Sequence, residues 1–441
     1  MSTTFDRSTA GTSTSRTSTA GASASDARSL EGGSFEVGAA TEPGAAALAM
    51  AERFARAFAA GAAAHDPPAS FAHEHVDALR EAGFLALPIP ALLGGLGVMS
   101  SRDVLVAASR LARGDAATAI GVNMHLAVTM NLVRQWRVTG ARGDRHAARG
   151  LAVTLERVAN GKITFAAAVS EPAQDLSRPA TTATRGADGW VVRGRKSFCT
   201  LAPAATVLNV GVTALDEDGS ARYAFAAVPV DSPGVEVHDD WDALGMRASG
   251  SQSVTFHDVV LPHAAVRDGF ALGSWNVELL ERYLVSGAFH AAASLGIAEA
   301  AHGAATASLR GKPLEGSSAA HTTMVLAQNV VELSTMQALF EAAARAIDDH
   351  HDAHPLGSAS FEAAIAVFSQ VQVAKAHLSE AAVRVVDRAL ALAGGAGYRS
   401  SHPLARAYRD ARAGAFMHPL GANRAYDFIA RAHLGLEPLA G

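Results

Sequence analysis

The chain has 441 residues, of which 49% are hydrophobic and 18% are charged, and its formal net charge is −5. This balance predicts a globular protein of two or three domains, and the lack of a basic run excludes the electrostatic footprint of a nucleic-acid-binding protein. The one cysteine, Cys199, excludes an internal disulfide framework and a thiolate metal cluster, which fits a reducing cytoplasm.

The N-terminal segment, residues 1–40, is rich in Ser, Thr, Ala and Gly and has no apolar core of a secretory signal. Such a segment buries too little surface to offset its ordering entropy, so we expect a disordered tail. No continuous apolar run reaches the roughly 20 residues that a membrane span needs, and we expect no membrane association.

Three segments of different character follow the tail. Residues 41–161 predict a helical domain, with apolar residues such as Val76 and Leu79 at three- and four-residue spacing and a helix end at Asn160-Gly161. Residues 162–270 carry β-branched and aromatic runs between Gly/Asp turns, which predict strands. Residues 271–441 return to long Ala-rich helical patterns. This order indicates an α+β chain with a helical C-terminal bundle.

Four segments carry the motifs with chemical content, and they resemble the signature sequences of the acyl-CoA dehydrogenase flavoprotein family. They are Val169-Ser170-Glu171-Pro172, Lys196-Ser197-Phe198-Cys199-Thr200, the Gly-rich turn 244–251, and Gly394-Gly395-Ala396-Gly397-Tyr398 with the later Arg409-Asp410 pair. The resemblance covers residues 71–435. It implies an N-terminal helical domain, a middle β domain and a C-terminal four-helix bundle.

A bound flavin is the cofactor that this resemblance implies, normally FAD. A flavin needs a flat apolar wall and hydrogen-bond donors along its pyrimidine edge, which an aromatic residue and hydroxyls on neighbouring strands supply. The implied cofactor-binding residues are Val169, Ser170, Phe198, Thr200, Arg310, Gly394 and Gly395, and the implied substrate-binding residues are Arg247 and Ser249. Alternatively, Phe198 is simply a core residue.

Two departures from the family bear on the reaction and the cofactor. In the common form a Glu follows the Arg-Asp pair by eight residues and removes the substrate proton, but here that position is His418. Some members carry the base on the first bundle helix, where this chain has Ser286 and the nearest acid is Glu281. The two glutamines that hold the adenosine half of FAD match Ala320 and Ala391, so FMN could suffice.

Three functions remain open. The first is α,β-dehydrogenation of an acyl thioester with His418 as base and an electron-transfer flavoprotein as acceptor. The second is a flavin-dependent monooxygenase, acting on an aromatic substrate, that forms a C4a-hydroperoxyflavin with reduced flavin from a partner reductase. There, His418 and His125 would flank the flavin, although His125 is also explained as a polar residue at a helix contact. The third is a flavin- or acyl-binding protein without turnover.

We expect dehydrogenation rather than oxygenation, because Ser170-Glu171-Pro172 and Thr200 follow the dehydrogenase form more closely. We also expect a cytoplasmic homotetramer without a metal, as the resemblance implies. The tract from Asp349 to His354 has the residue types of a metal site, but a solvated helix end explains it better.

Overall fold

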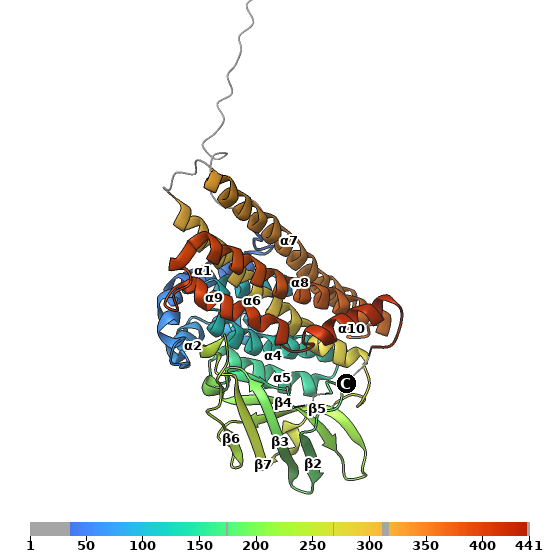
Figure 1. The fold of residues 1–441 in the computed structure, drawn as a ribbon. Helices are drawn as coiled ribbons and strands as arrows, with labels where there is room; N and C mark the ends of the chain where they lie inside the picture. Colours follow the sequence, from blue (N-terminus) through green and yellow to red (C-terminus); the bar gives the residue numbers. More distant parts are fainter. Residues whose placement is uncertain (1–35, 173–174, 268, 311–316, 439–441) are drawn as a thin grey trace, which may run out of the picture. The chain divides into compact units, whose positions relative to one another are not determined.

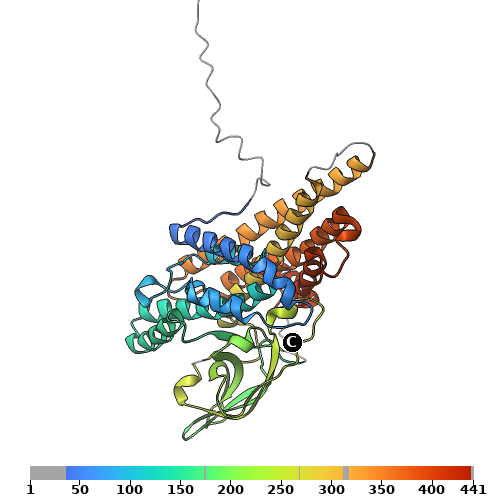
Figure 2. The same cartoon turned by 90° about the vertical axis from the view of Figure 1, so that its left-hand side faces the viewer.

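Five helices open the structured part of the chain. They are α1 (Glu42–His65), α2 (His73–Glu81), α3 (Ser101–Ala112), α4 (Ala116–Ala141) and α5 (Arg145–Ala159). The computed structural model describes residues 36–172, 175–267, 269–310 and 317–438, so most of the predicted tail lies outside the described residues. Residues from Val37 onward form one compact unit, shown from two sides in Figures 1 and 2.

The starts and ends of these helices follow from local side-chain chemistry. The carboxylate of Asp115 accepts hydrogen bonds from the backbone N–H groups of Ala117 and Thr118 and so caps α4. Helix α5 ends at Ala159, the residue predicted from sequence, because Gly161 adopts a left-handed φ of 69° that stops the helix.

A seven-stranded sheet follows the helices. Its strands are β1 (Phe165–Ala168), β2 (Thr182–Gly186), β3 (Gly189–Cys199), β4 (Val207–Leu215), β5 (Ala221–Pro229), β6 (Val235–Val237) and β7 (Gln252–Leu261). The order is β1-β4-β2-β3-β7-β6, and β5 pairs with the other edge of β4. Strand β4 runs parallel to β1 and β2, whereas the other pairs are antiparallel. The sheet brings the ends of β1 and β3 to the side facing the helices.

Five more helices complete the chain. They are α6 (Val277–Leu309), α7 (Ser317–Ala353), α8 (Phe361–Ala393), α9 (Pro403–Ala413) and α10 (Ala422–His433). One hydrophobic core joins this bundle to α1, α3 and α4, and a second core fills the sheet. In both views the strands gather below the helices, and α4 lies between bundle and sheet (Figures 1 and 2). The predicted α+β order of helices, strands and helices is confirmed.

Helices α4 and α6 have the length and mean hydropathy of membrane-spanning segments. In each, however, 89% of the apolar window is buried inside the structure, as in the core helices of a soluble protein. Long apolar helices are expected here because both pack against neighbours on most of their circumference.

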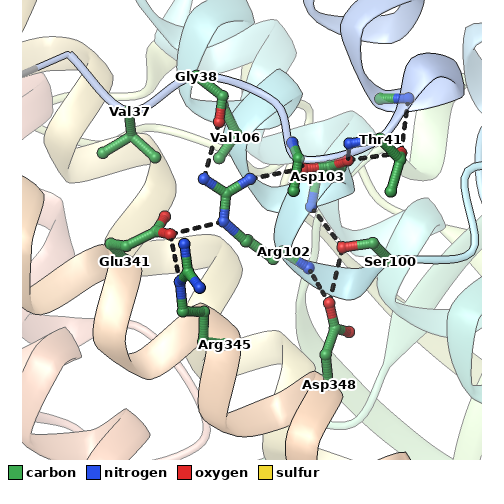
Figure 3. Close-up of polar contacts among 12 residues, drawn as sticks. Val37, Gly38, Thr41, Ser100, Arg102, Asp103, Val106, Glu341, Arg345 and Asp348 are labelled. Carbon is green, nitrogen blue, oxygen red and sulfur yellow. Dashed lines mark hydrogen bonds and ion pairs between the residues drawn. The ribbon is translucent and has the colours of Figure 1, made fainter.

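A buried polar cluster fixes the start of α1 against α3 and α7 (Figure 3). We call it the Arg102 network. The Arg102 guanidinium donates to Asp103 at 2.6 Å, to Glu341 at 2.7 Å and to the Gly38 carbonyl at 2.8 Å. Asp103 also accepts from the backbone N–H and the hydroxyl of Thr41. The network therefore pairs its guanidinium and its buried carboxylate on all sides.

Candidate active site

A cavity of about 700 Å³ lies where the helices meet the sheet. Its walls come from four parts of the chain: the middle of α4, the ends of β1 and β3, the turn 241–251, and the helical bundle from α6 to α10. This volume falls in the usual range for a small-molecule site, and its position between domains is a common one.

One wall combines an exposed aromatic ring with a row of hydroxyls. Phe198 is 61% exposed and has a left-handed φ of 54°, and its ring faces the Trp241 ring edge-to-face at 5.7 Å. Thr200 Oγ1 lies 2.9 Å from Ser251 Oγ, which lies 2.7 Å from Ser249 Oγ. Phe198 is therefore a cavity residue and not a core residue. A flat ring and adjacent hydroxyls are the partners that a flavin ring requires, so the residues fit that group.

A buried ion pair holds the segment after β1 beside this wall. The Lys196 ammonium donates to Glu171 Oε1 at 2.5 Å and to the Val169 carbonyl at 3.3 Å. Glu171 also accepts from the backbone N–H groups of Ala180 and Thr181, and its pKa is lowered because these partners and Lys196 outweigh the effect of burial. The Glu171 carboxylate thus positions Val169 and Ser170 in the cavity wall and is not free to act as a base.

The Arg409-Asp410 pair has a similar positioning role for the turn 244–246. The Asp410 carboxylate accepts the Met246 backbone N–H at 2.6 Å, and burial raises the pKa of Asp410 to about 7. Arg409 forms an ion pair with Asp66 at the end of α1. Gly245 packs so closely on α9 that an added Cβ would lie 2.2 Å from the Arg409 carbonyl oxygen. The pair fastens the turn against the bundle.

The floor of the cavity is polar. We use "cavity floor" for the lining residues Ser286, His290 and His418 together with Gln372 and Lys375, which are buried and do not line the cavity themselves. Burial, with help from Lys375 and Lys196, lowers the pKa of His418 to about 3, and its Nε2 has no hydrogen-bond partner. Its ring contacts the Tyr283 ring edge-on at 4.7 Å. His418 is therefore a neutral imidazole with one ring nitrogen available to a ligand.

The other floor residues surround His418. Both ring nitrogens of His290 and both amide atoms of Gln372 lack partners, although their side chains are buried. Burial and the nearby Lys375 and His418 lower the pKa of His290 well below its usual value. Lys375 donates to the Met417 and Leu420 carbonyls, and burial lowers its pKa to about 7. Polar groups left unpaired in a protein interior are costly, which indicates a ligand or ordered water here.

Two predicted catalytic residues lie outside the cavity lining. The His125 ring accepts the Phe165 backbone N–H at Nδ1 (3.0 Å) and bonds the Leu85 carbonyl through Nε2 (3.0 Å). Burial lowers the pKa of His125 to about 4, so it is a neutral residue that ties α4 to β1. The Glu281 carboxylate bonds His350 Nε2 at 3.0 Å, and the partner lowers its pKa. The structure thus explains both residues by packing.

The remaining predicted residues divide in the same way. Val169, Ser170 and Ser249 line the cavity with Phe198 and Thr200. The Arg247 guanidinium instead donates to the carbonyls of Asp66, Ala243 and Pro67 and so braces the turn from outside.

Arg310, which was assigned to the adenosine half of FAD, and the predicted flavin-binding residues Gly394 and Gly395 lie at element ends outside the cavity lining. Arg310 is the C-terminal cap of α6, and Gly394 and Gly395 follow α8. Within the described ranges, therefore, the cavity offers a place for a flavin ring but does not include these residues.

Sequence reasoning missed Arg282, Tyr283, His290 and Gln372. Three of them, with Ser286, lie on the face of α6 that lines the cavity. The signal was available: Arg282, Ser286 and His290 recur every four residues in a helix otherwise rich in Ala and Leu, which marks one polar stripe.

The comparisons with known proteins agree with this architecture. Three models of one family match the chain: acyl-CoA dehydrogenase N-terminal domain at residues 41–136, middle domain at 166–259 and C-terminal domain at 280–423. The chain is 34% identical to the amino sugar nitrososynthase DnmZ of Streptomyces peucetius over 90% of this chain and 94% of the relative. It is 25% identical to cyclohexane-1-carbonyl-CoA dehydrogenase of Syntrophus aciditrophicus, over 77% and 83% respectively.

Among solved structures, KijD3 in complex with FMN and dTDP-3-amino-2,3,6-trideoxy-4-keto-3-methyl-D-glucose superposes with a TM-score of 0.82. The two chains are 30% identical, and the match covers 92% of this chain and 97% of KijD3.

Proposed function

This chain belongs to the acyl-CoA dehydrogenase family, and we propose that within this family of flavoenzymes it is a two-component monooxygenase that oxygenates the amino group of a nucleotide-linked amino sugar. The similarity to DnmZ and KijD3 supports this substrate class. The proposal replaces the dehydrogenation that the motifs alone favoured with the reaction that the sequence had left as the alternative.

One observation carries the proposal: among the described residues, the cavity has no carboxylate that is free to act. Its one acidic lining residue, Glu171, is bonded to Lys196 and to two backbone N–H groups. α-Proton abstraction from an acyl thioester needs a base placed against the substrate, and the family's Glu is His418 here. Oxygen transfer to an amine needs no such base.

The same observation favours a reactive amine. An ammonium ion has no lone pair to attack oxygen, so the bound amine must be neutral. A cavity bordered by Arg282 and Arg409, with Lys375 buried in its floor and no free carboxylate among the described lining residues, disfavours the charged ammonium. Neutral His418 and His290 would exchange hydrogen bonds with the amine and orient it. Reduced flavin, when bound, supplies two electrons to dioxygen, so that one oxygen atom joins the amine nitrogen and the other leaves as water.

The polar floor also supports a sugar over an alkyl chain. An alkyl group bound against His290 and His418 would leave their unpaired ring nitrogens without partners, at a cost of about 1–3 kcal/mol for each group. The hydroxyl, keto and amino groups of a sugar would instead provide partners. The residues of this cavity therefore favour a hydrogen-bonding ligand.

FMN, rather than FAD, is the flavin that we propose, because Arg310, Gly394 and Gly395 are outside the cavity lining. The proposed partner is a separate reductase that delivers reduced flavin, and an electron-transfer flavoprotein is then not required. We also propose a cytoplasmic homotetramer. Exposed Met324, Val330 and Val331 on α7 support association of bundles, and light scattering of the purified protein would test it.

The test is to supply the enzyme with reduced FMN from a separate reductase, oxygen and a thymidine-diphosphate amino sugar. Mass spectrometry is expected to find a product heavier by one oxygen atom, the hydroxylamine, or its further oxidised nitroso form. The competing experiment is an anaerobic titration of the oxidised flavoprotein with a panel of acyl-CoAs. Bleaching by any of them, with no oxygenated sugar in the first assay, would overturn the proposal and favour dehydrogenation with His418 as base.

His418 provides the residue-level test. The His418→Gln variant is expected to lower oxygenated product formation by about 10- to 100-fold, because the amine loses the group that orients it. Bound flavin should remain, since His418 follows α9 and is separate from the Phe198 and Thr200 segment at the end of β3. The matched control is His321→Gln, an exposed position on α7. Equal product formation by His418→Gln and by the control would remove His418 from the reaction.

A further inference from the structure

One side of the cavity is formed by the first turns of α6 together with β4 and β5, and it carries two arginines. Arg282 of α6 lines the cavity, and so do Asn209 of β4 and Phe225 of β5. Arg267 lies directly behind them, because its backbone N–H donates to the Phe225 carbonyl at 3.1 Å. Arg282 therefore lines this corner of the cavity, and Arg267 lies behind the same wall.

Neither guanidinium has a carboxylate partner in the described part of the chain. Arg267 Nη2 donates to Asn209 Oδ1 at 2.6 Å, and its buried Nε has no partner. The Arg282 guanidinium lies over the Phe225 ring, with Cζ 4.9 Å from the ring centre, and makes no hydrogen bond or ion pair to a described residue. The adjacent acid, Glu281, is bonded to His350 instead.

Two largely buried guanidinium groups with no bonded carboxylate among the described residues are unfavourable without a ligand, because each loses hydration and they repel one another. The Arg102 network shows how this chain treats an arginine that has only a structural purpose: Arg102 is surrounded by Asp103, Glu341 and a carbonyl. The corner at Arg282 lacks such partners. Among the described residues, no carboxylate bonds either guanidinium, which leaves both able to bind an anionic ligand.

We propose that Arg282 and Arg267, with Asn209, form a subsite for a phosphate or diphosphate group. A guanidinium group can donate two parallel hydrogen bonds to phosphate oxygens. One phosphate group has enough oxygens to accept such bonds from two arginines at once. This inference rests on the proposed function, and it identifies the part of the nucleotide-linked substrate that the corner holds.

The position on α6 assigns the phosphate to the substrate and not to the flavin. Arg282, Ser286 and His290 face the same cavity from one helix, and at 1.5 Å per residue Arg282 lies roughly 12 Å along the axis from His290. The flavin-type wall of Phe198, Thr200 and Ser249 comes from other elements. A sugar attached to a diphosphate has both groups that these positions would bind: the diphosphate at Arg282 and the hydrogen-bonding sugar at His290.

The test measures ligand binding by calorimetry on the full-length flavoprotein, so it does not require turnover. The probes are thymidine diphosphate, thymidine and inorganic pyrophosphate for the substrate, and FMN and riboflavin for the cofactor. Wild-type protein is expected to bind thymidine diphosphate at least tenfold more tightly than thymidine. The Arg282→Gln variant is expected to lose that difference and pyrophosphate binding, and Arg282→Lys to retain part of both. Arg149→Gln, at an exposed position on α5, is the matched control.

Each outcome decides the proposal. Weaker FMN binding with unchanged riboflavin binding in Arg282→Gln would move the subsite to the flavin phosphate and overturn the assignment to substrate. Unchanged binding of every probe, or wild-type protein that binds neither thymidine diphosphate nor pyrophosphate, would remove the subsite. Arg282-dependent diphosphate binding without oxygenated product would preserve this inference and reject only the proposed reaction. Thermal unfolding of each variant checks its fold, and Arg282→Gln should unfold no earlier than wild type.

Discussion

The Arg102 network and the cavity floor are both buried and polar, yet they are built in opposite ways. In the network, Arg102 donates to two carboxylates and a carbonyl, and Asp103 accepts from α1 (Figure 3). In the floor, His290 and Gln372 have no partners, and His418 keeps one ring nitrogen free. Buried polar groups with hydrogen-bond partners stabilise the fold. Buried polar groups without partners lower its stability and remain available to bind a ligand. Glu341 Oε2 is the one unpaired buried side-chain atom among the described residues of the network, whereas the floor has several.

The largest effect expected from this comparison comes from breaking the network. Arg102→Met leaves Asp103 and Glu341 without their shared cation and should lower the free energy of unfolding by about 3–5 kcal/mol. Denaturant unfolding measures this change. Arg345→Met is the matched control, because Arg345 pairs with the same Glu341 from an exposed position and should cost less than about 1 kcal/mol. Equal costs for the two variants would contradict the structural role of the network.

A smaller effect is expected on the pH dependence of stability, through His290 in the cavity floor. The folded-state pKa of His290 is depressed by burial, so below the unfolded pKa of about 6.5 the unfolded chain binds a proton that the folded chain does not. His290 therefore makes a contribution to stability that is lost as pH decreases from 7 to 5. The His290→Leu variant should lack this pH-dependent contribution to the free energy of unfolding.

The comparison of His290→Leu with wild type, by denaturant unfolding at pH 7 and pH 5, isolates this contribution. The raised pKa of Asp410 acts in the opposite direction over the same range, but it is common to both proteins and cancels in the difference. His321→Leu, at an exposed site, provides the control. A difference between His290→Leu and wild type that stays constant with pH would show that His290 is charged or hydrated in the folded protein.

The smallest effect distinguishes two buried amides. Gln372→Leu removes two unpaired polar atoms, so it should leave stability unchanged or raise it by about 1 kcal/mol. Gln337→Leu removes a 2.8 Å hydrogen bond to Glu299 and should lower stability by about 1–2 kcal/mol. Thermal or denaturant unfolding of both variants tests the contrast. A destabilised Gln372→Leu variant would mean that the Gln372 amide is hydrogen-bonded through ordered water. Gln372 would then be a paired structural group, like the members of the Arg102 network.

The extent to which the sequence predicts the structure also differs between regions of the molecule. The α+β order and the family were predictable, because helical periodicity, strand composition and the four motifs are all local patterns. The cavity positions of Ser170, Phe198 and Thr200 follow the same motifs. Their roles in binding stay predictions that the proposed experiments address.

The remainder depends on three-dimensional partners that no local pattern reveals. Glu171 has the sequence signature of a site residue, but its pairing with Lys196 makes it a positioning residue. His125 resembles a catalytic histidine until its bonds to Phe165 and Leu85 are seen. Gln372 lies in a helix whose Ala-rich sequence does not show that its amide is buried without a partner. Whether a buried polar atom is paired is a property of the packed structure alone.

The cavity described above is walled by all three segments of the chain, with α4 on one side, the ends of β1 and β3 on another, and α6 to α10 on the third. No one segment retains a binding site if it separates from the other two. A bound fluorescent cofactor would consequently act as a built-in sensor of assembly. The temperature at which the cofactor is released would be the temperature at which the segments separate, even if the helices and strands of each segment remain folded.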